Sequence, residues 1–175
     1  EVGMEESLSF PRKRESRKVP QSSSMDPGYA SRSEMTTISP RVSFSNLTKV
    51  FWQEERYTKG DLIEYYEHIA PYVLPYLKDR PESLNRHPDG IQGASFFQKD
   101  ITNAPKWVKT VPIHSDSEKK DIHWLLCNDR ETLLYMANLG CIEINPWSSR
   151  YQKKEHPDYL IIDLDPSDVS FKEVV

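Results

Sequence analysis

Cysteine and long apolar runs are scarce in this sequence of 175 residues. Only Cys127 and Cys141 are present, and they form neither a CxxC motif nor a cluster with histidine, which argues against structural zinc and for a reducing compartment. No apolar run approaches the roughly 18 residues that a membrane-spanning helix needs, and the first residues are charged and polar, unlike a signal peptide. We therefore expect a cytoplasmic protein with no membrane partner.

Several familiar catalytic motifs are also missing. The sequence contains no GxSxG nucleophile elbow, no P-loop and no Rossmann fingerprint, and its 5 histidines show no metal-ligand spacing. The net charge of −4 does not indicate nucleic acid binding by the whole molecule, although a local basic patch can coexist with an acidic metal site. Because the chain begins with Glu1 and ends at Val175, two residues after Glu173 in an apparent new helix, we expect a partial protein.

The composition changes near residue 40. Residues 1–40 are rich in Ser, Pro and Arg and hold few aliphatic residues, so this segment is predicted to be a disordered tail. Its basic run, Arg12–Lys18, has the charge to contact phosphates, but a solvated tail is the commoner role of such runs. Residues 41–175 have the texture of one globular domain.

Helices and strands are both predicted in the globular part. Thr58 and Asp61 form a capping-box-like start to a helix that Pro71 and Pro75 should break or kink. Asp129 can cap a second helix, which ends at Gly140. The expected strands are residues 83–86, 94–99, 107–113, 122–127, 141–145 and 158–165. Strands outnumber helices without strict alternation, so the fold class is predicted to be α+β.

Two carboxylates close the last of these strands. Residues two apart in a strand point to the same face, so Asp163 and Asp165 project together from DYLIIDLD. Like charges on one face repel unless a cation neutralises them, and oxygen ligands suit Mg²⁺ or Mn²⁺. A DxDP sequence is also a common way simply to end a strand before a turn, so the metal site is the less frequent of two readings.

Other residues have the chemistry of nucleic-acid contacts. Phe96 and Phe97 are adjacent in a predicted strand, so one should enter the core and the other should be exposed, beside Lys99, for stacking on a base. Lys49 and Lys59 flank one segment, and Lys59 lies at a helix N-terminus, where anions bind. Covered phenylalanines and surface lysines without a task are the more frequent alternatives.

Two further polar residues follow strands. Arg86 precedes a turn and has the geometry to grip a phosphate, although a lone arginine carries little information. Asn145 ends another strand, where it faces either a ligand or solvent.

Considered together, these segments resemble one family. LTKVFWQEERYTKGDLIEYY, SLNRHPDG, ASFFQKD, CIEINPW and DYLIIDLDP occur in this order and approximate spacing in the polymerase domain of bacterial DNA ligase D, a member of the archaeo-eukaryotic primase superfamily. The resemblance covers about residues 42–175. It implies a mixed, largely antiparallel sheet with flanking helices, of which this chain is the N-terminal part.

The resemblance implies an activity and its partners. Such domains add nucleotides, from NTP or dNTP, to DNA ends and fill gaps during non-homologous end joining, using two Mn²⁺ or Mg²⁺ ions. Asp163 and Asp165 resemble two of three metal-binding carboxylates. The expected partners are DNA ends with a 5′-phosphate, Ku, and a ligase module on the same or another chain, in the cytoplasm at the nucleoid.

The family also implies roles for the other candidates. Lys49 and Lys59 resemble the lysines that hold the 5′-phosphate, and Phe96 and Phe97 the aromatic pair near the template base. The remaining matches, close to the nucleotide and template, are Arg86, Lys99 and Asn145, the last standing where relatives have histidine.

The family's third carboxylate and its Ser/Gly/His motif would lie beyond Val175, so we expect little polymerase activity from this chain alone. Two alternatives are a DNA-end-binding module without catalysis and a glycosyltransferase that uses its DxD to hold a metal.

Overall fold

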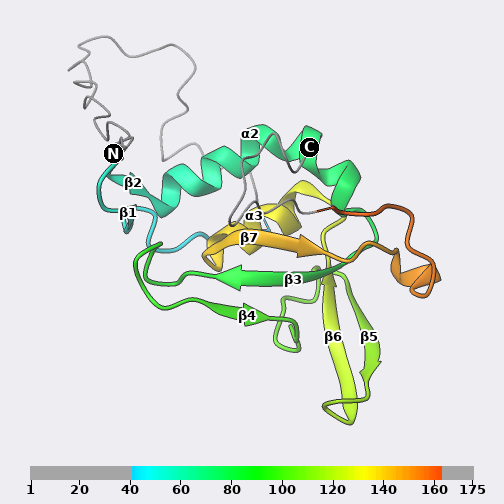
Figure 1. Ribbon diagram of the computed structural model, residues 1–175. Coiled ribbons are helices and arrows are strands. Elements are labelled where there is room, and N and C mark those ends of the chain that lie inside the picture. The colour runs from blue at the N-terminus through cyan, green and yellow to red at the C-terminus, as the bar shows by residue number, and fades with distance from the viewer. Residues whose placement is uncertain (1–40, 163–175) are drawn as a thin grey trace, which may run out of the picture. The chain divides into compact units, whose positions relative to one another are not determined.

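The computed structural model describes residues 41–162 (Figure 1). Its elements, in chain order, are β1 (Val50–Trp52), β2 (Tyr57–Thr58), α2 (Lys59–Leu77), β3 (Pro81–Arg86), β4 (Phe96–Gln98), β5 (Thr110–Ser115), β6 (Lys120–Leu126), α3 (Arg130–Asn138), β7 (Cys141–Pro146) and the 3₁₀ helix η1 (Tyr151–Lys153). Every strand pair among these residues is antiparallel. The α+β prediction with an antiparallel sheet is therefore confirmed.

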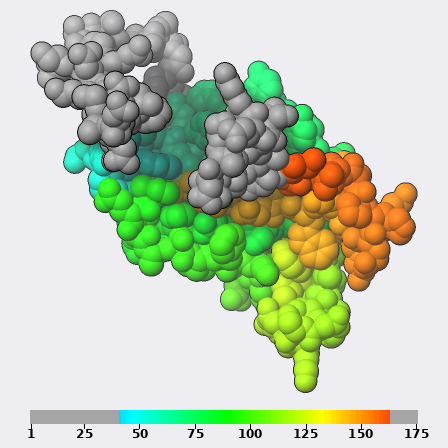
Figure 2. Space-filling model, in the orientation of Figure 1, coloured from blue at the N-terminus to red at the C-terminus, as the bar shows by residue number. Residues whose placement is uncertain are grey.

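Strand β3 is the centre of the main sheet. β7 pairs along one of its edges, whereas β4 and β6 share the other edge, β4 beside the second half of β3 and β6 beside the first. β5 pairs only with β6, and this hairpin projects away from the rest of the sheet (Figures 1 and 2, yellow-green). The short pair β1–β2 forms a separate sheet beside the start of α2.

Helix α2 begins where the capping signal predicts. The Asp61 amide donates to Thr58 Oγ1 at 3.3 Å, and the Thr58 amide donates to Asp61 Oδ2 at 2.6 Å, which completes a capping box. Of the two predicted effects of Pro71 and Pro75, a break or a kink, the break is wrong, because α2 continues through both. Both prolines lie on the exposed face, where water can bind the carbonyls that each ring leaves without a donor.

Helix α3 has equally local boundaries. The Asp129 carboxylate accepts a hydrogen bond from the Thr132 amide at 2.8 Å, as predicted for an N-cap. Gly140 follows the helix with a φ of +78°, a conformation that L side chains rarely adopt. A Cβ atom there would lie 3.1 Å from the carbonyl oxygen of His87, so glycine lets α3 turn directly into β7.

The core lies between the sheet and the two helices. Apolar side chains of both helices pack against those of β3, β6 and β7 in one continuous cluster. Its fully buried members include Phe51, Ile63, Leu84, Leu125, Leu133, Met136 and Cys141. No helix among residues 41–162 is long and apolar enough to cross a membrane.

The predicted strand over residues 158–165 is not found in its described part. Residues 158–162 belong to no strand, and Leu160, Ile161 and Ile162 are 81%, 67% and 72% exposed. The apolar pattern indicated burial, but burial needs a neighbour, and no strand among residues 41–162 pairs with this segment. Asp163 and Asp165 lie outside the described residues.

Candidate nucleic-acid interface

The two candidate lysines lie side by side. The Lys59 amide donates to the Lys49 carbonyl at 2.8 Å, at the open end of the β1–β2 hairpin. Lys59 is also the first residue of α2, where the helix dipole favours an anion. The fold therefore brings together two cations that are ten positions apart in the sequence.

Lys59 is buried without a carboxylate partner among the described residues. Its ammonium group donates to the Ser45 carbonyl at 2.8 Å and lies 3.4 Å from Ser45 Oγ, and the residue is only 5% exposed. Burial, followed by repulsion from Lys49 and Arg86, lowers the pKa of Lys59 to about 8. An anion bound beside these three cations would relieve that repulsion.

Lys49 is held differently. Its ammonium group donates to the Pro88 carbonyl at 2.7 Å and forms an ion pair with Asp89 at 2.6 Å. Asp89 is exposed, so this pair is one that a doubly charged phosphate can replace. The Lys49 ammonium group is thus a positive charge whose counterion, the Asp89 carboxylate, is weakly held.

Arg86 is fixed at the end of β3. Its Nε donates to the Leu139 carbonyl at 2.9 Å and its Nη1 to Gln98 Oε1 at 2.6 Å. Burial lowers its pKa. The guanidinium lies over the Phe96 ring, 5.1 Å from the centroid. Arg86 also lines a polar pocket of about 420 Å³ together with Gln98, Asp100, Thr102, Asn103 and Tyr135.

The phenylalanine pair differs from the prediction. Phe96 lies opposite Arg86 and Phe97 opposite Asn85, so the two rings do point to opposite faces of the sheet. Both are exposed, Phe96 by 45% and Phe97 by 62%, so the expectation that one of them enters the core is wrong. β4 is only three residues long and lies at the sheet edge, where no helix covers either face. The segment that carries it is part of the green surface in Figure 2.

The two remaining predicted contacts are Lys99 and Asn145. Lys99 follows β4 and is exposed, with no ion pair to a described residue. Asn145 lies in β7 opposite Ser83, three residues along β3 from Arg86, and its amide donates to the Ser83 carbonyl at 3.4 Å. The structure therefore joins Lys49, Lys59, Arg86 and Phe96 and leaves Asn145 on another part of the sheet.

Asn145 shares its face of the sheet with residues that sequence reasoning missed. Asn85 and Glu143 lie directly opposite each other on β3 and β7, and Glu143 is two residues from Asn145. Asn85 is 8% exposed, yet its Oδ1 has no hydrogen-bond partner in the part of the chain that the structure describes. The alternation of CIEIN would have placed Glu143 beside Asn145, whereas only the register places Asn85 there.

The described residues do not form the expected metal site. Residues 41–162 contain no group of three His, Cys, Asp or Glu side chains that could hold a metal ion. The carboxylate pair proposed for this role, Asp163 and Asp165, lies outside them.

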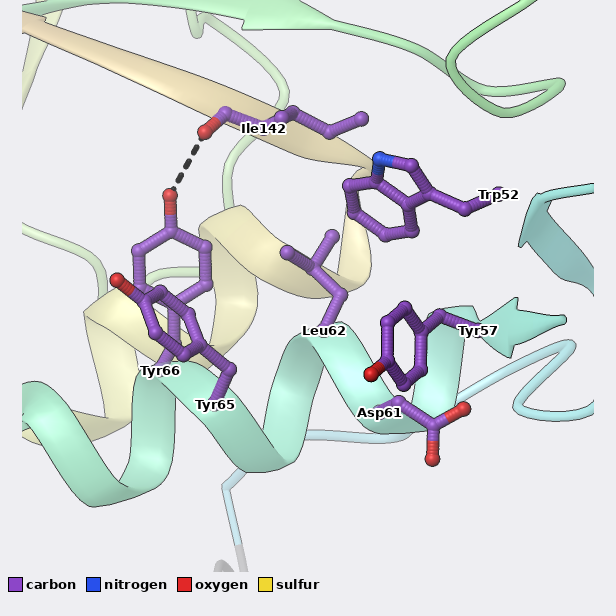
Figure 3. Close-up of a pocket in the computed structure, with 7 residues that line it drawn as sticks. All are labelled: Trp52, Tyr57, Asp61, Leu62, Tyr65, Tyr66 and Ile142. Carbon is purple, nitrogen blue, oxygen red and sulfur yellow. Dashed lines mark hydrogen bonds between the residues drawn. The ribbon is translucent and has the colours of Figure 1, made fainter. Parts of the chain in front are cut away.

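An apolar pocket of about 470 Å³ lies between the start of α2, the β1–β2 pair and β7 (Figure 3). Its lining residues are Trp52, Tyr57, Asp61, Leu62, Tyr65, Tyr66 and Ile142. The Tyr66 hydroxyl donates to the Ile142 carbonyl at 2.9 Å across it. With no cation in its wall, this pocket does not suit a phosphate.

A family model and several relatives match the chain. The model of the LigD primase-polymerase domain matches residues 58–175. The bifunctional non-homologous end joining protein LigD of Bacillus subtilis is 32% identical over 131 residues, which are 74% of this chain and 20% of the relative. The multifunctional LigD of Mycolicibacterium smegmatis is 28% identical over 73% of this chain and 17% of its own length. The chain thus spans a fifth or less of these relatives.

A solved structure has the same fold. The polymerase domain of Mycobacterium tuberculosis ligase D, in complex with DNA, superposes with a TM-score of 0.60 at 25% identity. The match covers 63% of this chain and 38% of that one.

Proposed function

The chain belongs to the LigD primase-polymerase domain family, and on that premise we propose that it binds DNA ends carrying a 5′-phosphate and serves in adding nucleotides to them. The reaction is nucleotidyl transfer from an NTP or dNTP during gap filling in non-homologous end joining. Ku and a ligase module, on this or another chain, are the proposed protein partners.

The observation that carries the proposal is the cation cluster at the start of α2. Lys49, Lys59 and Arg86 lie close enough for both neighbours to lower the pKa of Lys59. In the free protein the three positive charges repel one another. A bound phosphate dianion neutralises part of that charge, so its binding relieves the repulsion. The helix N-terminus adds its partial positive charge at the same place.

The exposed rings beside this cluster suit the DNA that carries the phosphate. Phe96 and Phe97 offer two faces at a sheet edge, and base–aromatic stacking does not depend on sequence. Arg86 lies under Phe96 and places a further positive charge there. Lys99, exposed after β4, supports contact with the template backbone.

The proposed metals are Mn²⁺ or Mg²⁺. Asp163 and Asp165 supply the oxygen donors that these ions prefer, and neither residue is among those the structure describes. When bound, two such ions stabilise the attacking and leaving oxygens of a phosphoryl transfer. The described residues contribute binding and orientation: the lysines position the phosphorylated strand, and the phenylalanines position the template base.

Equilibrium binding to a gapped duplex tests the proposal. The duplex is used with and without the downstream 5′-phosphate, at two salt concentrations, because phosphate contacts weaken as salt rises. We expect tighter binding to the phosphorylated gap and loss of that preference in Lys49→Ala and Lys59→Ala. Lys154→Ala, an exposed lysine beside η1, is the matched control and should keep it. Equal binding of both duplexes by the folded wild-type chain would overturn the proposal.

A further inference from the structure

The polar pocket beside Arg86 lies where β4, the turn after it and the end of α3 meet. Arg86 enters its wall from the end of β3, Gln98 from β4 and Tyr135 from α3. The turn contributes residues 100–104, and the bond from the Ile101 amide to the His123 carbonyl at 2.9 Å ties it to β6. The pocket therefore has walls from four separate elements of the fold.

Arg86 is a cation without a carboxylate partner among the described residues. Its Nε and Nη1 donate to the Leu139 carbonyl and to Gln98 Oε1, both of which are neutral acceptors. These bonds orient the guanidinium and leave its charge in place. Its Nη2 has no partner among residues 41–162. A half-buried charge of this kind is costly in the free protein, and an anion in the pocket would neutralise it.

Asp100 is the acidic residue in the pocket wall, and its charge is directed elsewhere. Its carboxylate forms an ion pair with Lys120 at 3.5 Å. It also accepts hydrogen bonds from the Thr102 hydroxyl at 2.6 Å and from the His123 amide at 3.4 Å. The bond from Thr102 contributes most to lowering the pKa of Asp100. Because Lys120 balances this carboxylate, Arg86 leaves the pocket with a positive charge.

Neutral donors accompany that charge. Burial raises the pKa of the Tyr135 hydroxyl, and the nearby charge of Arg86 offsets part of this, so the hydroxyl keeps its proton. The Tyr135 ring is held in an edge contact with Trp107, 5.8 Å between ring centroids. Asn103 is exposed in the wall, and its side-chain amide has no hydrogen-bond partner in the described part of the chain. Both groups are suited to donate to the oxygens of an anion.

The neighbouring cations indicate which anion the pocket binds. Arg86 is close enough to Lys59 to lower its pKa, so the pocket lies beside the proposed 5′-phosphate site. A strand whose 5′-phosphate is held by Lys49 and Lys59 carries its next negative charge on the phosphodiester one nucleotide further along. The volume of about 420 Å³ is within the range of small-ligand pockets, roughly 300–1,000 Å³, which leaves room for the adjoining sugar.

Resting on the proposed function, we propose that this pocket binds the phosphodiester that follows the 5′-terminal nucleotide of the downstream strand. Arg86 supplies the charge, and Tyr135 and Asn103 donate hydrogen bonds to the non-bridging oxygens. The protein then holds two consecutive phosphates of one strand. A phosphorylated strand end gains affinity from both, whereas a free 5′-mononucleotide offers only the first, so the pocket favours DNA ends over free nucleotides.

A neutral linkage in the DNA tests this proposal on the wild-type chain. A methylphosphonate replaces the first phosphodiester of the downstream strand in the gapped duplex, and binding is followed by fluorescence anisotropy. Two control duplexes carry the same group either at the fourth linkage of that strand or in the template opposite the first linkage. We expect about tenfold weaker binding for the first linkage alone, from the loss of a charge-assisted contact. An equal effect at all three positions, or no effect at the first, would overturn the proposal.

Variants of the pocket identify the residues that read this linkage. Arg86→Gln should bind the unmodified and the methylphosphonate duplex about equally. Because Arg86 also bonds to Leu139 and Gln98, Tyr135→Phe and Asn103→Ala are added as variants that leave those bonds intact. Each should reduce the penalty of the neutral linkage, whereas Tyr72→Phe, on the exposed face of α2, should keep it in full. A full penalty in all three pocket variants would show that another site contacts this phosphate.

The same duplexes separate this inference from the proposed function. A wild-type preference for the 5′-phosphate that is lost in Lys59→Ala, combined with indifference to the methylphosphonate, would leave the proposed function in place and refute the pocket assignment. Absence of any 5′-phosphate preference would overturn both. Weaker binding to the neutral first linkage together with a 5′-phosphate preference is the result that we expect.

Discussion

Glu82 makes stability depend on pH in an unusual direction. It lies in β3 between Leu125 of β6 and Pro146 of β7 and is 0% exposed, and neither carboxyl oxygen has a hydrogen-bond partner among residues 41–162. Burial raises its pKa from 4.5 to about 9, and the attraction of Arg80 offsets only part of this. The Arg80 guanidinium is already bonded to Asp158 and to the Trp147 carbonyl.

The expected effect follows from proton linkage. The unfolded chain ionises Glu82 above pH 4.5, whereas the folded chain keeps it protonated up to about pH 9. Folding therefore takes up a proton in this window, and the free energy of unfolding falls by about 1.4 kcal/mol for each pH unit until it levels off above pH 9. At pH 7 ionisation of Glu82 in the unfolded chain has lowered the free energy of unfolding by about 3 kcal/mol, a loss that a chain without this carboxyl does not show.

Urea unfolding at pH 5.5, 7 and 8.5, followed by tryptophan fluorescence, measures this loss. Glu82→Gln should remove the slope, gaining about 4 kcal/mol on the wild type between the two extremes. Glu82→Leu should in addition remove the unpaired polar group and be more stable than the wild type at every pH. Glu118→Gln, on an exposed turn, is the control. An identical pH dependence in Glu82→Gln and the wild type would refute the reasoning.

Three further predictions concern the interface and the fold. Because the pKa of Lys59 is about 8 in the protein without DNA, affinity for the 5′-phosphate should fall by up to about tenfold per pH unit above 8. Competition binding measures this pH dependence, which should be absent in Lys59→Ala. Phe97→Ala should weaken binding of single-stranded template by about 1–3 kcal/mol in a fluorescence titration, with little change in melting temperature because the ring is exposed; wild-type affinity would show that the ring does not stack. Gly140→Ala should destabilise the fold by about 1–3 kcal/mol in urea, since it forces a side chain to φ +78° against His87; unchanged stability would contradict this.

The helices were predictable because their signals are local. Thr58 and Asp129 accept bonds from amides three residues ahead, so a short stretch of sequence determines each helix start. The effect of Pro71 and Pro75 was not predictable in the same way. The free energy that each proline costs the helix depends on whether the carbonyl left without a donor is solvated or buried. That depends on which face of α2 the rest of the protein covers.

The interface was predictable by residue type and not by geometry. The resemblance identified Lys49, Lys59 and Arg86, but their proximity depends on the β1–β2 hairpin and on the position of β3 beneath α3. The burial of Lys59 against Ser45 has no sequence signal, because the two residues are joined only by tertiary packing. Asn85 was missed for the same reason, since register alone places it opposite Glu143. The comparisons lend no support to the glycosyltransferase alternative.

The central claim is that Lys59 and the DNA 5′-phosphate recognise each other. The most direct measurement is a cycle of four dissociation constants, for the wild type and Lys59→Ala, each with the phosphorylated and the unphosphorylated gapped duplex. The account predicts that the phosphate tightens binding to the wild type and adds far less to Lys59→Ala, a coupling of about 1.5 kcal/mol or more for a charge-assisted bond. An equal effect of the phosphate on both proteins would contradict it.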